Sequence, residues 1–384
     1  MRIAVVSPNL PTPALPMRGV SHDEQLRLFA AGHEVRAVVP LPWSPRRWWA
    51  GHRVPGEERD SGVVVAHPRY PRVPRLGPGF AGTVERALFA RAAAAALPAS
   101  PDIVLTHSVS LPGGLLGRVG GARFVVTLHD HELYDLAPHS AALRRAIVRT
   151  LRGADCAVYV SEALRRHGVS LAGSHRTALI PLGIHTFPGL SWTPVERFTV
   201  CTVTRLIARK RVDQLVRVFA RLKAERADAR LVIVGDGPER AALERLADNL
   251  PLAGSVEFTG ALGARAARER MSRASVMALP SVRESLGAVY LEAMSLGVPA
   301  LGTRGEGIEE HIEHGVSGIL VPAGEDDALL AELRALAGNP ARARAIGEAG
   351  RRRFLAGRFS WRANVESYLA LFDELLSGRA TQTT

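Results

Sequence analysis

Two glutamates in the second half of the chain are spaced so that both could face one crevice. Glu284 and Glu292 lie in the stretch Glu-Ser-Leu-Gly-Ala-Val-Tyr-Leu-Glu, which continues as Ala-Met-Ser-Leu-Gly-Val-Pro. The pattern predicts a strand that ends at Leu279, a loop that holds Glu284, and a helix near Gly287 that turns Glu292 back toward the same crevice. Carboxylates accept hydrogen bonds from sugar hydroxyls, and the amides of Leu286 and Gly287 can receive an anion or a hydroxyl. The alternative interpretation is a pair of surface charges.

A cluster of basic residues follows the strand predicted over 199–204. It reads Arg205-Leu-Ile-Ala-Arg-Lys210-Arg211 and leads into a predicted helix. Arginine offers a planar fork of donors and lysine a mobile point charge, and both suit a diphosphate beside a helix N-terminus. A solvated run of charges is the common alternative. Composition favours a function for Lys210, because Lys223 is the only other lysine and arginine fills every other basic position.

The remaining motifs exclude several common kinds of site. Gly235-Asp-Gly-Pro238 stands at a strand-to-helix turn, but Glu239 and Arg240 follow it, so it does not match the Gly-x-Gly-x-x-Gly dinucleotide fingerprint. The chain also lacks a Gly-x-x-x-x-Gly-Lys-Ser/Thr phosphate loop and an Asp-x-Asp metal motif. Two cysteines are too few for a disulfide scaffold or a zinc site built on several thiolates. We therefore expect no dehydrogenase and no metal.

Apolar runs alternate with helical patterns along most of the chain, which predicts an α/β protein with parallel sheets covered on both faces. Prolines and glycines interrupt this alternation at 181–194. A length of 384 residues also exceeds one ordinary hydrophobic core. We expect two Rossmann-like doubly wound domains and a terminal helix that opens at Ser360, with the divisions 1–190, 191–358 and 359–384.

The motif of the two glutamates resembles the signature of the family 4 retaining glycosyltransferases. Further segments resemble that family in the same order: the strand end before His129, Ile180-Pro-Leu-Gly183, Arg205 with Lys210, the Gly235 turn, and Phe258-Thr-Gly260. The resemblance implies the GT-B fold, in which two Rossmann-like domains face each other across a cleft and a C-terminal helix crosses back onto the first. It also implies that the first domain binds the acceptor and the second binds the donor.

The resemblance implies a role for each matching residue. Arg205 and Lys210 would bind the donor diphosphate, and Glu284 would hold a hydroxyl of the donor sugar. Glu292 would contact the ribose, and His129 would lie near the reacting sugar. The other implied donor-binding residues are Gly19, Gly235, Gly260, Ser285, Leu286 and Gly287. The chain departs from the family at Arg18, Thr204 and Arg211, where glycine is usual.

The predicted reaction is transfer of a hexose from a UDP- or GDP-sugar to a glycan, a lipid-linked sugar or a small-molecule acceptor. The resemblance implies retention at the anomeric carbon, with the departing phosphate helping to deprotonate the acceptor, and with no metal or cofactor. Arg205 and Lys210 would stabilise the charge on the leaving group. Two alternatives stay open: a nucleotide-sugar epimerase or hydrolase of the same fold, and a basic membrane-binding protein without catalytic activity.

A net charge of +12 suggests an anionic partner. Because the basic residues are nearly all arginine, codon preference accounts for much of this charge, and we expect that the partner is not a nucleic acid. The excess lies in the first half, where Trp43, Trp48 and Trp49 stand among arginines in the irregular segment 40–78. This segment could line an acceptor site, contact a membrane surface, or pack as a loop. The sequence shows no signal peptide or apolar membrane span, so we expect a cytoplasmic protein with peripheral contact at the inner membrane face.

Overall fold

The computed structural model describes residues 1–7, 20–43, 56–71, 78–109, 119–129, 133–134, 138 and 140–378. The chain forms two compact units, Met1–Gly183 with Ser360–Thr384, and Ile184–Phe359. The chain enters the second unit before the division expected after residue 190. Trp192, just after that division, is fixed to the second unit, because its amide donates to the carbonyl of Leu296 and its indole Nε1 donates to the carbonyl of Ala274.

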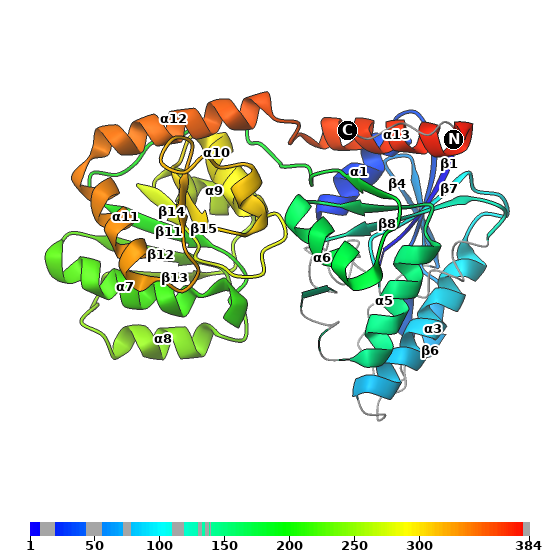
Figure 1. Cartoon of the computed structure of the whole chain (residues 1–384), viewed down its shortest axis with the longest axis horizontal. Helices are drawn as coiled ribbons and strands as arrows, with labels where there is room; N and C mark the ends of the chain where they lie inside the picture. The colour runs from blue at the N-terminus through cyan, green and yellow to red at the C-terminus, as the bar shows by residue number, and fades with distance from the viewer. Residues whose placement is uncertain are drawn as a thin grey trace. The chain divides into compact units, whose positions relative to one another are not determined.

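The first unit is built on an eight-stranded sheet in the order β10-β9-β8-β7-β1-β2-β5-β4 (Figure 1). All neighbouring strands are parallel except β4 and β5. The strands are β1 (Arg2–Val6), β2 (Glu34–Val38), β4 (Glu57–Asp60), β5 (Val63–Ala66), β7 (Ile103–Thr106), β8 (Arg123–Leu128), β9 (Cys156–Tyr159) and β10 (Thr177–Leu179). The helices are α1 (Val20–Ala30), α3 (Pro78–Ala96), α5 (Ala141–Gly153), α6 (Glu162–Ala172) and α13 (Trp361–Ser377).

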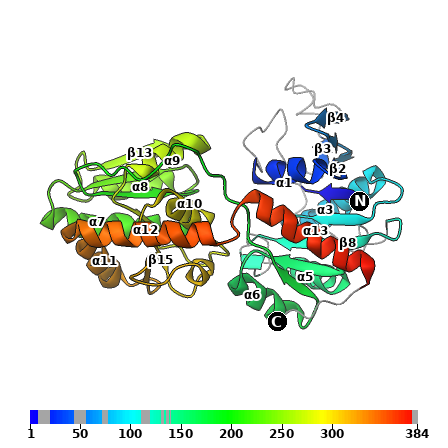
Figure 2. The ribbon, with the colours of Figure 1, turned by 90° about the horizontal axis from the view of Figure 1, so that it is seen from above.

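The C-terminal helix α13 packs on the first unit beside α1, as the resemblance predicts (Figure 2). Ser360 caps its N-terminus by accepting from the amide of Ala363. The ring of Phe372 is fully buried and packs against Phe29 of α1, with ring centroids 5.9 Å apart. Tyr368 reaches the sheet, where its hydroxyl lies 2.7 Å from Thr127 Oγ1. The helix therefore completes the hydrophobic core of the first unit.

The segment 40–78, which the sequence analysis treats as irregular, contains several short strands in its described residues. Besides β5, its described residues form β4, which pairs antiparallel with β5, and a small parallel ladder of β3 (Leu41–Trp43) with β6 (Arg69–Pro71). Trp48 and Trp49 lie outside the described residues. The short strands escaped prediction because three or four residues carry too little periodicity to identify.

The second unit is a six-stranded parallel sheet in the order β13-β12-β11-β14-β15-β16. Its strands are β11 (Thr199–Val203), β12 (Arg230–Val234), β13 (Val256–Gly260), β14 (Val276–Ala278), β15 (Ala300–Thr303) and β16 (Ile319–Val321). Its helices are α7 (Val212–Glu225), α8 (Arg240–Asp248), α9 (Ala264–Ser272), α10 (Ala288–Leu296), α11 (Asp326–Gly338) and α12 (Pro340–Ala356). Leucines and valines of α7, α8 and α11 pack on one face of the sheet, and α9 packs on the other.

The strand order of the second unit fixes where a ligand would bind. Successive strands run outward from β11 in one direction and from β14 in the other, so the order reverses between these two neighbours. Open α/β sheets bind nucleotides in the crevice at such a switch point, at the carboxyl ends of the strands. The loops after β11 and β14 are therefore the segments that position a site.

Candidate active site

The loops after β11 and β14 are joined by one backbone hydrogen bond and one from a side chain. The amide of Val282 donates to the carbonyl of Arg209 at 2.9 Å, and Arg209 Nη1 donates to the carbonyl of Arg283 at 2.9 Å. These bonds bring Lys210 Nζ into an ion pair with Glu284 Oε2, and both side chains are largely buried, with exposed fractions of 13% and 6%. Two residues that the sequence singled out separately thus meet at the switch point.

Glu306, from the loop after β15, holds the Glu284 loop in place. Its carboxylate accepts from the amide of Arg283 at 2.9 Å and from the amide of Glu284 at 2.6 Å. Arg283 has a left-handed backbone with φ 55°, a conformation that needs such support outside glycine. Burial raises the pKa of Glu306, and the two amide hydrogen bonds partly oppose this shift. The sequence analysis assigned no role to this glutamate.

The basic loop after β11, Arg205–Arg211, contains both a buried and an exposed cation. Lys210 ends a short 3-10 helix, Ala208–Lys210, and Arg211 follows it with φ 50°. This left-handed conformation is the physical reason that glycine suits the position of Arg211. Arg205 is exposed, and within the described part of the chain no carboxylate lies within ion-pair distance of its guanidinium. The loop therefore offers an accessible cation beside the buried lysine.

Gly235 and Gly260 lie at the ends of the neighbouring strands β12 and β13. The amide of Gly235 donates to the carbonyl of Gly260 at 2.9 Å. A Cβ atom on Gly235 would lie 1.8 Å from the carbonyl oxygen of Thr204, and its φ of 138° also disfavours a side chain. The structure thus gives Gly235 a packing role against the loop after β11. Direct contact of either glycine with a donor stays a prediction.

The start of α10 presents backbone amides to the crevice. Gly287 is the N-cap residue, with φ 70°, and Ser285 and Leu286 before it are buried. Among the described residues, no acceptor is bonded to the amides of Ser285, Leu286 or Gly287. Free amides at a helix N-terminus favour an anion or a hydroxyl. These three amides are therefore available to donate hydrogen bonds to a ligand.

Glu292, on the second turn of α10, pairs with a residue that sequence reasoning missed. Arg268 Nη2 of α9 contacts Glu292 Oε1, and the exposed fractions of the two side chains are 10% and 16%. Burial raises the pKa of Glu292, and the charge of Arg268 opposes that shift. Burial likewise lowers the pKa of Arg268. No sequence signal distinguished this arginine from its neighbours on α9.

In the first unit, His129 follows β8 and lies against His107, which follows β7. His107 Nδ1 is 3.2 Å from His129 Nε2, and the two rings stack with centroids 5.4 Å apart. Sequence reasoning found His129 and missed His107. The signal for His107 was its place at the end of the neighbouring strand. Gly19 and Arg18 lie outside the described residues.

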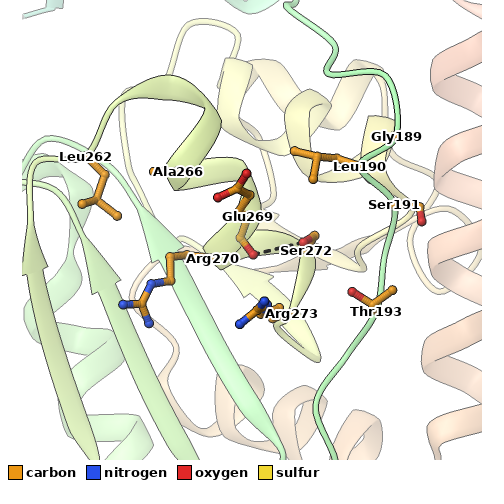
Figure 3. A pocket seen from close by; sticks show the side chains of 10 residues that line it. All are labelled: Gly189, Leu190, Ser191, Thr193, Leu262, Ala266, Glu269, Arg270, Ser272 and Arg273. Atoms are coloured by element: carbon orange, nitrogen blue, oxygen red, sulfur yellow. Dashed lines mark hydrogen bonds between the residues drawn. The ribbon is translucent and has the colours of Figure 1, made fainter.

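A separate cavity of about 660 Å³ lies beside α9 in the second unit (Figure 3). Figure 3 shows it between α9 and the segment 189–193. It is lined by Gly189, Leu190, Ser191, Thr193, Leu262, Ala266, Glu269, Arg270, Ser272 and Arg273. None of the site residues predicted from the sequence lines it. The candidate site thus rests on the switch point and its side-chain pairs rather than on this cavity.

Comparison with known proteins identifies the family. The family model described as "Glycosyl transferases group 1" matches residues 192–353, and "Glycosyltransferase Family 4" matches residues 24–186. A GDP-mannose-dependent alpha-(1-6)-phosphatidylinositol monomannoside mannosyltransferase of Mycolicibacterium smegmatis is 33% identical over 291 residues, which cover 71% of this chain and 74% of that protein. The chain belongs to the family 4 glycosyltransferases. A GDP-mannose-dependent monoacylated alpha-(1-6)-phosphatidylinositol monomannoside mannosyltransferase of Corynebacterium glutamicum is 29% identical to this glycosyltransferase, with 66% of the chain and 70% of that protein covered.

Solved structures confirm the GT-B fold of the glycosyltransferase. Sucrose-phosphate synthase from Thermosynechococcus elongatus has a TM-score of 0.78 at 21% identity, covering 98% of this chain and 100% of that one. Anabaena HepE in complex with UDP and glucose has a TM-score of 0.72 at 18% identity, covering 97% and 100%. Within the described part of the glycosyltransferase, no helix is both long enough and apolar enough to cross a bilayer.

Proposed function

We propose that this glycosyltransferase transfers a hexose from a nucleoside-diphosphate sugar with retention of anomeric configuration and without a metal. The observation that carries the proposal is the buried Lys210–Glu284 pair beside the exposed Arg205, at the switch point of a six-stranded Rossmann sheet. A nucleotide diphosphate suits this place because it gains negative charge as the glycosidic bond breaks. Arg205 and Lys210 supply the opposite charge.

Each side chain has one task in the proposed reaction. Arg205 and Lys210 bind the diphosphate, and Glu284 accepts a hydrogen bond from a hydroxyl of the donor sugar. The departing phosphate takes the proton of the acceptor hydroxyl on the face from which it leaves, so the new bond forms on that same face. No protein nucleophile is needed. The amides of Leu286 and Gly287 donate to the sugar or the phosphate.

The remaining assignments extend the same proposal. Glu292 accepts from the ribose hydroxyls of the donor, Gly19 lies close to its phosphates, and His129 contacts the reacting sugar. The second unit, which carries Arg205 and Lys210, binds the donor, and the first unit binds the acceptor. The stacked contact of His129 with His107 supports a fixed ring orientation for the first-unit histidine.

GDP-mannose is the first donor to test, because the two relatives described above are named as GDP-mannose-dependent enzymes. UDP-glucose is the second, since HepE was solved with UDP and glucose. A ligand that binds the folded state at 100 times its Kd stabilises it by about 2.7 kcal/mol. We expect one of these donors to raise the Tm of the glycosyltransferase, and unchanged Tm values with UDP-, GDP-, ADP- and TDP-sugars would contradict the proposal.

We further propose a lipid-linked acceptor at the cytoplasmic face of a membrane. The two mannosyltransferase relatives are named for phosphatidylinositol mannosides, and the basic excess of the chain lies in its first half. The tryptophans and arginines of 40–78 supply a membrane contact. Flotation with vesicles that contain phosphatidylinositol should recover the protein, whereas neutral vesicles should not. Equal recovery with both, or with neither, would contradict the membrane contact.

Product analysis separates transfer from its alternatives. A transferase releases nucleoside diphosphate in proportion to the acceptor present and leaves the sugar on that acceptor. A hydrolase of the same fold would release free sugar without an acceptor. An epimerase would transfer no sugar to the acceptor and would instead change the configuration of the donor sugar. The configuration in the product is read from the one-bond coupling constant between C1 and H1 of the transferred sugar.

A further inference from the structure

The ion pair between Arg268 and Glu292 joins two neighbouring helices inside the second unit. Arg268 lies on α9 and Glu292 on α10, and these helices contact each other. Arg268 as a whole residue is 8% exposed, although it is an arginine in a helix that carries several solvent-facing arginines. Removing two charges from water costs free energy that an ion pair recovers incompletely. A buried pair of this kind therefore calls for a reason other than stability.

The hydrogen bonding of the Arg268 guanidinium is incomplete. Its Nε is buried and has no hydrogen-bond partner among the described residues. Across those same residues, Arg268 is also the one side chain that forms an ion pair with the carboxylate of Glu292. The carboxylate keeps a small exposed fraction, 16% of its side chain, so part of it stays accessible. One side of the carboxylate is thus held while the other can accept from a ligand.

The position of Glu292 on α10 brings this carboxylate close to the switch-point loop. Glu292 stands four residues after Ala288, the first residue of α10, which corresponds to about 6 Å along the helix axis. Glu284 and the amides before Gly287 lie at the start of the same helix. A nucleotide whose diphosphate meets that helix start has its ribose within reach of the first turns.

We propose that Arg268 is a positioning residue that fixes the carboxylate of Glu292 so that it accepts hydrogen bonds from the ribose hydroxyls of the nucleotide. This inference rests on the proposed donor-binding function and adds to it the residue that sets ribose recognition. Arg268 does not itself touch the nucleotide. Its planar guanidinium orients a carboxylate better than a lysine would, because a lysine offers a point charge on a flexible stem.

The test compares binding of a nucleotide with binding of its analogue without ribose hydroxyls. Titration calorimetry of the full chain measures the Kd of GDP and of 2′,3′-dideoxy-GDP, and of the UDP pair where UDP binds more tightly. A charge-assisted hydrogen bond is worth about tenfold or more in affinity, so the wild type should prefer the hydroxylated nucleotide by at least about tenfold. Arg268→Met and Arg268→Gln should both lose most of that preference.

Three further variants define the cause of the loss. Glu292→Gln should lose the same preference, and Arg268→Met combined with Glu292→Gln should lose no more than either alone, because both act on one contact. Arg268→Lys should regain part of the preference. Arg265→Met is the matched control, since Arg265 lies on the same helix but pairs with Glu269 at the surface. Its preference should equal that of the wild type.

The outcomes separate this inference from the proposed function. Arg268→Met and Arg268→Gln could both keep the wild-type preference for the ribose hydroxyls while Glu292→Gln loses it. That result would overturn the positioning role and leave donor binding intact. A wild type that binds GDP or UDP without any preference for the ribose hydroxyls would also overturn it. A wild type that binds neither nucleotide would remove the proposed function and this inference with it. Arg268→Gln keeps a polar side chain in the buried position, so the test does not depend on the methionine variant folding.

Discussion

At the scale of single residues, the site separates an accessible cation from a buried one. Arg205 is exposed, whereas Lys210 is held by Glu284 in a nearly closed environment. Preorganised charge is most effective where water is excluded, because the groups need no reorganisation as charge develops. The buried pair therefore fixes the geometry, and the exposed arginine can move onto an arriving diphosphate.

Replacing Arg205 should impair the reaction without harming the fold. We predict that Arg205→Met lowers kcat by a factor of roughly 100 to 1,000, the loss typical of one preorganised donor. The Tm without ligand should stay unchanged, because the side chain is exposed and has no carboxylate partner in the described structure. Arg245→Met on α8 is the matched control, as Arg245 is also exposed. A kcat within threefold of the wild type for Arg205→Met would contradict the diphosphate role.

The residues that the sequence revealed differ in kind from those that it concealed. Glu284, Glu292 and Lys210 stand in motifs of unusual composition or spacing, so they could be found one by one. Their partners could not. Arg268 is one of four arginines between 265 and 273, and only the packing of α9 against α10 decides which of them turns inward.

Glu306 and His107 show the same limit. Glu306 bonds to backbone amides more than twenty positions earlier in the chain, and His107 meets His129 because β7 and β8 are neighbours in the sheet. Contacts between distant segments leave no local pattern for sequence reasoning to read. The pairing of Lys210 with Glu284 was unpredicted for this reason, although each residue had been singled out.

At the scale of elements, the turn after β15 packs tightly against the loop that holds Glu284. A Cβ atom on Gly307 would lie 1.7 Å from the carbonyl oxygen of Ser285, and the amide of Gly307 donates to the carbonyl of Glu284. The turn after β15 therefore determines where the Glu284 loop lies. No side chain can be added at this glycine unless the backbone of one loop shifts.

Gly307→Ala should displace the Glu284 loop and weaken donor binding. We expect at least a tenfold increase in donor KM, because a misplaced carboxylate loses its hydrogen bond to the sugar. Gly338→Ala is the control, since a Cβ atom there meets nothing within 4 Å. Steady-state kinetics measure both variants. An unchanged donor KM in Gly307→Ala would show that the loop position does not matter for the donor.

The burial of His311, whose ring packs against Phe359, makes the stability of the second unit depend on pH. The two rings pack edge to face with centroids 4.9 Å apart. Burial, with a smaller contribution from the charge of Arg353, lowers the pKa of His311 to about 4. The unfolded chain binds this proton near pH 6.5, whereas the folded chain does not, so stability is lost as the pH falls from 6.5 toward 4.

His311→Phe should remove this acid sensitivity. The wild type should lose about 2 kcal/mol more than the variant between pH 7.5 and pH 5, from this one group. The comparison is made within each protein, as the difference between its Tm values at the two pH values. Equal differences in the wild type and in His311→Phe would show that the histidine titrates normally in the folded state.

At the scale of the whole molecule, the alternation of strands and helices was predictable, and the closing of the first unit by α13 followed from the resemblance. Apolar runs gave the long strands because each is buried on both faces. β16, with three residues, and the α6 helix before β10 were not foreseen. The two units have separate hydrophobic cores, so each should respond on its own to substitutions within it.

Phe372→Ala tests the dependence of the first unit on α13. The side chain is fully buried between Phe29 and Tyr368, so its removal should cost about 3–5 kcal/mol. We expect calorimetry to show an early transition for the first unit and an unchanged transition for the second. Leu376→Ala, at a residue that is 42% exposed on the same helix, should leave both transitions in place. An unchanged first transition in Phe372→Ala would contradict the role of α13.

The most direct test of the central claim is titration of a nucleoside-diphosphate sugar into the wild type, Lys210→Met and Lys223→Met. Lys223 is the chain's other lysine, and its ammonium donates to the backbone carbonyls of Ala227 and Ala229. The account predicts that the wild type and Lys223→Met bind the donor alike, and that Lys210→Met binds at least tenfold more weakly and transfers no detectable sugar. Wild-type affinity and transfer in Lys210→Met would contradict it.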